Sequence, residues 1–142
     1  METAPQPSWS LDPQLARDTV AIGELPLARA LLMNDANYPW IVLVPRRPGA
    51  VEIIDLDSEQ QDQLMDEIAI LSQVLKDVTR CDKLNIAAIG NIVPQLHVHI
   101  VARRRDDAAW PRPVWGAAPA RIYEPAERER LIAAIRAEVA FG

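Results

Sequence analysis

The stretch QLHVHIV, residues 95–101, alternates polar and apolar side chains, which is the pattern of a half-buried β-strand. Successive side chains of a strand point to opposite faces, so Gln95, His97 and His99 share one face. Leucine, valine and isoleucine occupy the other. We therefore expect the apolar face to lie on a hydrophobic core and the polar face to point into a cleft or toward a partner.

Upstream of this strand, residues 58–80 carry the signals of one long helix. Ser58 and Gln61 have the spacing of a capping box at its start. Apolar residues then recur at spacings of four and three, which places them on one face of a helix. This stripe consists of Leu64, Ile68, Leu71, Leu75 and Val78. We expect the helix to end near Arg80 and its stripe to pack on the apolar face of the histidine strand.

Short apolar runs between turn-forming residues predict the rest of the sheet. Three strands follow one another from Thr19 to Pro45 in the runs VAIGELP, LARALLM and WIVLVP. A fourth covers residues 83–89, and the histidine strand extends over residues 95–103. The links between the first three runs are too short for parallel crossovers, so these strands are expected to pair antiparallel.

The C-terminal segment, residues 106–142, begins with a loop rich in proline and tryptophan and ends in a helix. Pro125 suits the first position of that helix. One face of the helix carries Leu131, Ile132, Ile135 and Val139. The order strands, helix, strands, helix predicts an α+β fold with about five mainly antiparallel strands, one long helix and a C-terminal helix.

The composition fits one globular domain over residues 1–142, since 49% of the residues are apolar and 25% are charged. Residues 1–11 are predicted to form a loose N-terminal tail, with Trp9 and Leu11 as its candidate anchors. The single cysteine, Cys81, excludes an internal disulfide and a zinc cluster built from thiolates.

The charge and hydropathy of the chain limit its partners. A net charge of −5 provides no general positive field for nucleic acid or an anionic membrane surface. No apolar run approaches the roughly 20 residues of a membrane-spanning helix. The start of the sequence lacks the basic and apolar blocks of a signal peptide, so we expect a cytoplasmic protein.

The histidine pair admits three interpretations: the polar face of a half-solvated sheet, a metal site, or a catalytic pair. A metal site needs a third ligand, here a carboxylate, and the strand has no acid close to His97 and His99 in sequence. In a catalytic pair, one imidazole attacks phosphorus at neutral pH and the other binds or protonates the departing group. The residues alone leave these three interpretations open.

The segment NIVPQLHVHIVAR, residues 91–103, resembles the signature of the histidine triad superfamily, in which three histidines alternate with apolar residues on a strand. Members are nucleotidyl hydrolases and transferases whose middle histidine attacks an α-phosphate and forms a covalent nucleotidyl-histidine. The resemblance implies that His97 is this nucleophile and that His99 contacts the phosphate or the leaving-group oxygen. Gln95 stands at the first triad position, as in a bacterial branch that also has a tryptophan-containing tail similar to WPRPVWG.

Further residues become candidate substrate ligands. The resemblance places Asn91 beside the scissile phosphate and Asn34 on the ribose, whereas asparagine after a strand also suits a simple turn. Arg103 is a candidate for a charge-assisted bond to phosphate, or else a solvated strand end paired with nearby acids. Trp110 and Trp115 either stack on a base or pack the loop onto the body or a partner.

Two departures from the family pattern affect the chemistry. Gln95 donates and accepts hydrogen bonds but cannot carry a proton between groups. Pro39 and Trp40 stand where many members have a glycine and a histidine. Whatever that upstream histidine contributes is therefore absent from this chain.

The resemblance implies a hydrolase or nucleotidyl transferase that acts on phosphoramidate or phosphoanhydride bonds of nucleotides without a cofactor or metal. The expected substrate is a purine nucleotide conjugate, and neither nucleic acid nor a membrane is expected as a partner. A homodimer is implied through the long helix and residues 83–89, an apolar run that invites pairing as an exposed edge. The alternatives are a nucleotide-binding module without useful turnover and a metal-binding or scaffold protein.

Overall fold

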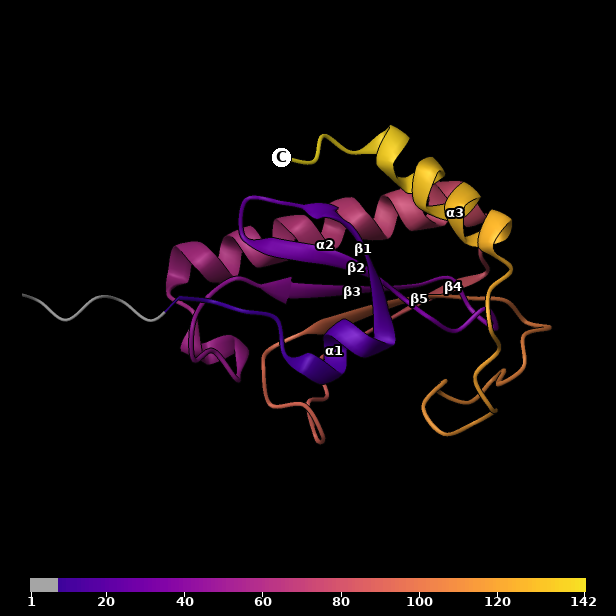
Figure 1. Cartoon of the computed structure of the whole chain (residues 1–142), viewed down its shortest axis with the longest axis horizontal. Coiled ribbons are helices and arrows are strands. Elements are labelled where there is room, and N and C mark those ends of the chain that lie inside the picture. The colour runs from indigo at the N-terminus through magenta and orange to yellow at the C-terminus, as the bar shows by residue number, and fades with distance from the viewer. Residues whose placement is uncertain (1–7) are drawn as a thin grey trace, which may run out of the picture.

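A computed structural model describes residues 8–142, in which one sheet has helices on both faces (Figure 1). The elements are α1 (Pro13–Asp18), β1 (Thr19–Glu24), β2 (Ala28–Met33), β3 (Trp40–Pro45), the 3-10 turn η1 (Ile53–Asp55), α2 (Ser58–Thr79), β4 (Lys83–Ala87), β5 (Val98–Arg103) and α3 (Pro125–Glu138). The strands lie in the order β1-β2-β3-β5-β4, and all neighbours are antiparallel. The predicted α+β fold is confirmed.

The last two strands are shorter than predicted. β4 ends at Ala87, and β5 begins at Val98. Pairing of β5 with β3 stops close to Pro45, whose nitrogen has no hydrogen to donate to a further ladder bond. Gln95 and His97 therefore lie in the loop that leads into β5 rather than on the strand itself.

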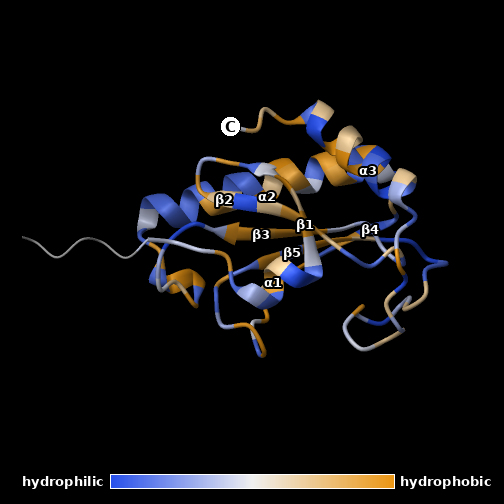
Figure 2. Cartoon of the chain, in the orientation of Figure 1, coloured by the Kyte–Doolittle hydropathy of each residue, from blue (hydrophilic) through white to orange (hydrophobic). Residues whose placement is uncertain are grey.

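Helices α2 and α3 cover one face of the sheet (Figure 1). The predicted stripe of α2 shares a hydrophobic cluster with the apolar side chains of the histidine segment, which confirms their packing. The cluster includes Leu64, Ile68, Leu71, Leu75, Leu96, Val98 and Ile100. Every residue of β3 is buried, and this central strand is largely orange in Figure 2.

The N-terminus of α2 differs from the sequence prediction by one residue. The capping box is formed by Asp57 and Gln60 rather than by Ser58 and Gln61. The Asp57 carboxylate accepts from the Gln60 backbone N–H (2.8 Å), and the Gln60 amide oxygen accepts from the Asp57 backbone N–H (2.9 Å). A carboxylate cap adds favourable charge at the positive end of the helix dipole. The predicted end is confirmed, since α2 stops at its left-handed C-cap Arg80.

α1 and the loop after β5 cover the opposite face of the sheet. Their side chains join a second hydrophobic cluster that includes Leu15, Tyr38, Trp40, Val42, Val101 and Val114. Trp9 and Leu11 pack against this cluster, and the Arg29 guanidinium lies 4.9 Å from the centre of the Trp9 ring. Both predicted anchors are thus confirmed, whereas residues 1–7 of the predicted tail lie outside the described residues. Within residues 8–142, no helix is long and apolar enough to cross a membrane.

Candidate active site

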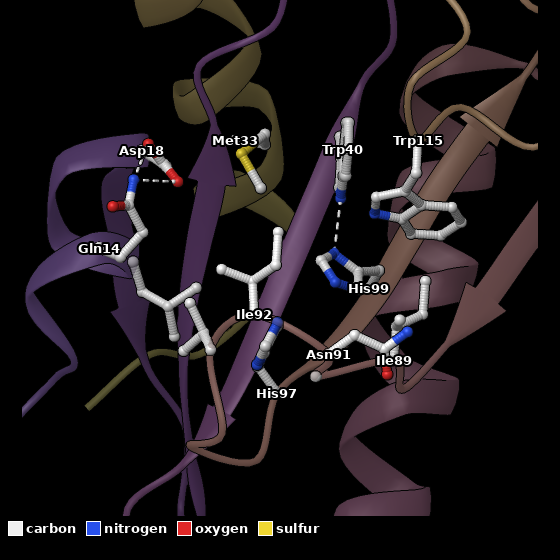
Figure 3. A pocket seen from close by; sticks show the side chains of 13 residues that line it. Gln14, Asp18, Met33, Trp40, Ile89, Asn91, Ile92, His97, His99 and Trp115 are labelled. Atoms are coloured by element: carbon white, nitrogen blue, oxygen red, sulfur yellow. Dashed lines mark hydrogen bonds between the residues drawn. The ribbon is translucent and has the colours of Figure 1, made fainter.

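A cavity of about 490 Å³ lies beside the histidine pair (Figure 3). Its walls come from α1, from the loop of residues 89–93, and from two tryptophans, Trp40 of β3 and Trp115 of the C-terminal loop. His97 and His99 both line this cavity, called the pocket below. Two residues of the predicted polar face, His97 and His99, therefore do open into a cleft.

His97 is held by the main chain of its own loop. Its Nδ1 lies 2.7 Å from the carbonyl oxygen of Gln95. A carbonyl oxygen only accepts hydrogen bonds, so Nδ1 carries the proton and Nε2 of the neutral ring keeps its lone pair. His97 is 7% exposed, so its neighbours restrain the ring, which still lies at the wall of the pocket. His97 thus has the protonation pattern of a nucleophile that attacks through Nε2.

His99 has the opposite pattern because its partner is a donor. The indole N–H of Trp40 donates to Nδ1 of His99 at 3.0 Å (Figure 3). An indole N–H cannot accept, so Nδ1 holds the lone pair and Nε2 of the neutral ring carries the proton. Burial, and next the charge of His97, lower the pKa of His99 to about 4. His99 is therefore a neutral hydrogen-bond donor at pH 7.

Aromatic rings surround His99 on three sides. Its ring centre lies 4.9 Å from that of His97, 5.6 Å from Trp40 and 5.1 Å from Trp115, and each pair meets edge to face. Trp40 and Trp115 also meet edge to face at 5.7 Å. Trp115 thus packs its loop onto the body beside Trp40 and His99 and lines the pocket. Trp40 supplies a hydrogen bond to His99 that the sequence did not reveal.

Gln95 departs from its predicted place on the polar face. Its amide oxygen accepts from the backbone N–H of Asp12 (2.8 Å), and its amide nitrogen donates to the carbonyl oxygen of Ser10 (2.8 Å). Strand alternation misplaced this side chain because Gln95 precedes β5. The contact of Gln95 with His97 is made by the main-chain carbonyl instead.

Arg103 is not brought to the pocket, and its residue is 1% exposed. Nε and Nη2 donate to the two carboxylate oxygens of Asp107 (2.8 and 3.0 Å), and Nη1 donates to Asn85 Oδ1 (2.8 Å). The rings of Tyr38 and Trp110 lie 5.7 and 5.5 Å from the guanidinium. The guanidinium is thus engaged inside the protein, which contradicts the predicted phosphate contact, and Trp110 packs the loop onto the body.

The other two predicted substrate ligands, Asn91 and Asn34, differ in whether they line the pocket. Asn91 lines the pocket from the 89–93 loop, on the side of the histidines. Asn34 is exposed in the turn after β2 and does not line the pocket, whereas its neighbour Met33 does. In this structure, Asn34 therefore has the position of a turn residue.

Two polar residues of α1, Gln14 and Asp18, line the pocket and were not singled out from the sequence. The amide nitrogen of Gln14 donates to both carboxylate oxygens of Asp18, at 2.9 and 3.0 Å. Their spacing of four residues could have indicated this pair in the sequence, because it puts two side chains on the same face of a helix.

A metal site finds no support among the described side chains. Across residues 8–142, no three His, Cys, Asp or Glu side chains gather where they would hold a metal ion.

A comparison with protein families matches most of the chain. Residues 14–106 match the HIT domain family, and these residues run from α1 to just beyond β5. No curated protein matches the chain.

Several solved structures share both sequence and fold with this chain. A histidine triad protein from Bradyrhizobium japonicum is 59% identical, with 94% of this chain and 100% of that one covered and a TM-score of 0.94. A histidine triad protein from Sinorhizobium meliloti 1021 is 41% identical over 92% of this chain and 97% of that one, with a TM-score of 0.90. One from Marinobacter aquaeolei VT8 is 42% identical over 92% and 96%, with a TM-score of 0.89.

Proposed function

The chain belongs to the histidine triad (HIT) family, and on this premise we propose that it is a nucleotide hydrolase or nucleotidyl transferase with His97 as its nucleophile. The hydrogen bond between Nδ1 of His97 and the Gln95 carbonyl carries this proposal. It leaves an unprotonated Nε2 on a restrained ring at the wall of a pocket. An imidazole nitrogen in that state attacks phosphorus without first losing a proton.

In the first proposed step, the lone pair of His97 Nε2 forms a bond to the α-phosphorus. The bond from phosphorus to the leaving nitrogen or oxygen breaks, and its electron pair goes to the leaving group, which accepts a hydrogen bond from His99 Nε2–H. The imidazole of His97 becomes positively charged, and the Gln95 carbonyl stabilises that charge through Nδ1–H.

In the second step, a water molecule or another acceptor attacks the same phosphorus. Nε2 of His97 leaves with the electron pair of its bond to phosphorus, and the acceptor loses a proton to the solvent. With water as the acceptor, the product is a nucleoside monophosphate. Asn91 and His99 are placed in this proposal as donors to the phosphate oxygens, which offsets charge that develops in the transition state. The scheme uses no cofactor.

A nucleotide-binding module without turnover is the second candidate. The observation that favours it is the orientation of Gln95, whose side chain is engaged by Ser10 and Asp12. The first triad position then supplies no titratable side chain for moving a proton. Under this candidate the same pocket retains a nucleotide but does not cleave it.

We also propose a homodimer that forms through β4 and α2. β4 is the outer strand next to β5, and its Ile86 is 49% exposed. Met65 and Ile70 of α2 are exposed as well. An unpaired edge with apolar side chains favours pairing with a second copy. A cytoplasmic location is part of the proposal, since a reducing compartment suits the free thiol of Cys81.

The decisive experiment incubates wild type and His97→Ala with adenosine phosphoramidates and dinucleoside polyphosphates in the presence of a chelator. Release of nucleoside monophosphate is measured. We expect release by wild type and a loss of at least about 10³-fold in His97→Ala. Glu138→Gln, in an exposed residue of α3 away from the pocket, is the control and should match wild type.

Two other outcomes decide between the candidates. Release that persists in His97→Ala would exclude His97 as the nucleophile. If wild type releases nothing from any substrate of the panel and yet binds AMP, the binding module replaces the enzyme.

A further inference from the structure

We propose that Trp40 holds His99 as a neutral hydrogen-bond donor that keeps its proton, so that the pocket cleaves bonds whose leaving group departs as an anion. This inference rests on the proposed function, because it takes His97 as the nucleophile at phosphorus. It extends that function to the class of bond that is broken. A phosphoanhydride, which releases an anionic oxygen, is favoured over a phosphoramidate, whose leaving nitrogen needs a proton.

The first support is the direction of the hydrogen bond between Trp40 and His99. The indole N–H donates to Nδ1 of His99 at 3.0 Å (Figure 3). An imidazolium needs a proton on both nitrogens, and a proton on Nδ1 would point at the hydrogen of the indole. Trp40 therefore disfavours the charged ring and leaves the neutral ring with its proton on Nε2. The N–H of a neutral imidazole is a far weaker acid than an imidazolium.

The second support is that the surroundings of His99 also oppose a positive charge. The residue is 5% exposed, and its ring meets those of Trp40, Trp115 and His97 edge to face. Both tryptophans are neutral, so neither balances a charge on the imidazole. Burial, and next the charge of His97, lower the pKa of His99 to about 4. Geometry and burial thus act in the same direction.

The third support is that the other groups of the pocket are not placed to supply the proton. Nδ1–H of His97 is engaged by the Gln95 carbonyl, and Nε2 of His97 bonds to phosphorus in the proposed reaction. The Gln95 side chain has no titratable group and binds the main chain of the N-terminal segment. Among the described residues that line the pocket, the remaining titratable side chain is Asp18. Both of its oxygens accept from Gln14, as those of an ionised carboxylate do.

The two classes of bond differ in where the electron pair of the broken bond goes. When His97 Nε2 bonds to phosphorus and the P–O bond of an anhydride breaks, the pair stays on an oxygen whose charge spreads over a phosphate group. His99 stabilises that oxygen by donating a hydrogen bond from Nε2–H and keeps its proton. When a P–N bond breaks, the pair stays on a strongly basic nitrogen unless a proton arrives in the same step. A neutral His99 would have to become an imidazolate to supply it, which is unfavourable.

The test compares leaving groups of different basicity on the same adenylyl group, with a chelator present. The compounds are diadenosine triphosphate, which releases ADP, an alkylamine amidate of AMP, and aryl esters of AMP with phenols of increasing pKa. Release of AMP gives kcat/KM for each. Wild type should cleave the anhydride about 10²- to 10⁴-fold faster than the amidate, which is the range that a general acid contributes. In the ester series, log kcat/KM should fall steeply as the pKa of the phenol rises, because the leaving oxygen takes the full charge.

Two variants test the roles of Trp40 and His99 at pH 6, where an unconstrained imidazole is largely charged. Trp40→Phe frees Nδ1 of His99 to take a proton, so the ratio of anhydride to amidate cleavage should fall about tenfold and the ester series should become shallower. His99→Gln keeps an N–H donor that does not transfer a proton. It should lower every rate and retain the wild-type ratio and slope. Trp115→Phe, the aromatic control, should also retain both, and Glu138→Gln should match wild type throughout.

Each outcome is distinct. If wild type cleaves the amidate within about tenfold of the anhydride, or if its ester series is shallow, His99 acts as an acid, so the inference is wrong and the proposed function stands. A selective loss of amidate cleavage in His99→Gln, or a wild-type ratio and slope in Trp40→Phe, would also overturn it. If wild type releases AMP from none of the compounds, the proposed function fails, and the inference fails with it. Thermal unfolding establishes that each variant is folded, and wild type with His99→Gln decides the question if Trp40→Phe is not.

Discussion

His97 and His99 are held in opposite protonation patterns by one neighbour each. A carbonyl oxygen next to His97 fixes the proton on Nδ1, and the indole of Trp40 next to His99 fixes it on Nε2. Each assignment for the neutral ring follows from what the neighbour is able to donate or accept. Two identical side chains two residues apart thus carry the proton on different nitrogens, which suits the proposed roles of His97 as nucleophile and His99 as donor.

Replacing Trp40 by phenylalanine removes the donor and keeps an aromatic ring. We expect kcat to fall about tenfold with KM nearly unchanged, since one hydrogen bond that orients the donor is worth about 1 kcal/mol or slightly more. NMR of the imidazole nitrogens should show His99 losing its single tautomer. Trp115→Phe is the control, because it changes the same wall and leaves the bond between Trp40 and His99 in place. Equal losses in both variants with an unchanged His99 tautomer would contradict this role of Trp40.

The low pKa of His99 predicts a pH-dependent stability. The folded-state pKa is about 4 against 6.5 for the free side chain, so the unfolded state binds the proton first as the pH falls. The free energy of unfolding therefore keeps its full value, as far as His99 is concerned, above about pH 6.5. It falls progressively as the pH is lowered to about 4. Between pH 7 and pH 4.5 this loss is about 2 kcal/mol.

Urea unfolding at those two pH values measures the effect. The free energy of unfolding of wild type should fall between these pH values by about 2 kcal/mol more than that of His99→Gln. Both proteins retain His97, the ring that faces His99, and all carboxylates, so the difference between them measures the protonation of residue 99 together with its interaction with His97. An equal loss in the two proteins would mean that His99 titrates normally when folded.

At the scale of elements, the short helix α1 is the part of the pocket that depends most on the rest of the chain. A helix of six residues is not stable in isolation. Asp12 caps it, Gln95 binds the main chain at its start, and the Thr19 hydroxyl donates to the carbonyl oxygen of Leu15 at its end (2.7 Å). One face of α1 then becomes a wall of the pocket.

Gln95→Ala separates the positioning of α1 from catalysis at His97. The substitution removes both side-chain bonds to the N-terminal segment and keeps the carbonyl that holds His97. We expect KM to rise about tenfold with kcat largely retained, and the free energy of unfolding to fall by about 2 kcal/mol. Gln73→Ala, in an exposed glutamine of α2, controls for the loss of an amide. A fall in kcat at constant KM would instead show that the Gln95 side chain acts on the reaction.

The sequence predicted the elements well where a long pattern specified them. The stripe of α2 and the runs of β1, β2 and β3 place their residues correctly, because periodicity over many residues averages out local exceptions. Single positions at the ends of elements were predicted less well. Asp57 and Ser58 both suit an N-cap, and Gln95 lies where alternation has already ended. Contacts such as Trp40 with His99 depend on how β3 and β5 pair, which no local pattern encodes.

At the scale of the whole molecule, the pocket joins three distant parts of the chain: α1, the segment around β5, and the C-terminal loop with Trp115. Arg103 holds that loop in place. Its guanidinium links Asp107 of the loop to Asn85 of β4. Burial opposes ionisation of Asp107, but the bonds from Arg103 and from nearby backbone N–H groups outweigh it and lower the pKa of this carboxyl.

Asp107→Asn leaves the buried guanidinium of Arg103 without its charged partner. We expect the free energy of unfolding to fall by about 3 kcal/mol, which corresponds to about 10 °C in Tm for a chain of this size. Asp106→Asn is the matched control, because the Asp106 side chain is 88% exposed in its pair with Arg104, and it should change little. Thermal unfolding followed by circular dichroism measures both. Similar values for the two variants would mean that the loop is held mainly by Trp110 and its apolar neighbours.

The tautomers of both histidines, and with them the proposed attacking imidazole, are set by β5, its preceding loop and β3, whereas α1 and the C-terminal loop supply other walls of the pocket. Selection acting on those two walls is able to change which compound is accepted while the reactive centre stays intact. Among related proteins, the sequence differences that change substrate preference are therefore expected before residue 19 and after residue 105. Exchanging these two segments between relatives offers a direct route to altered specificity.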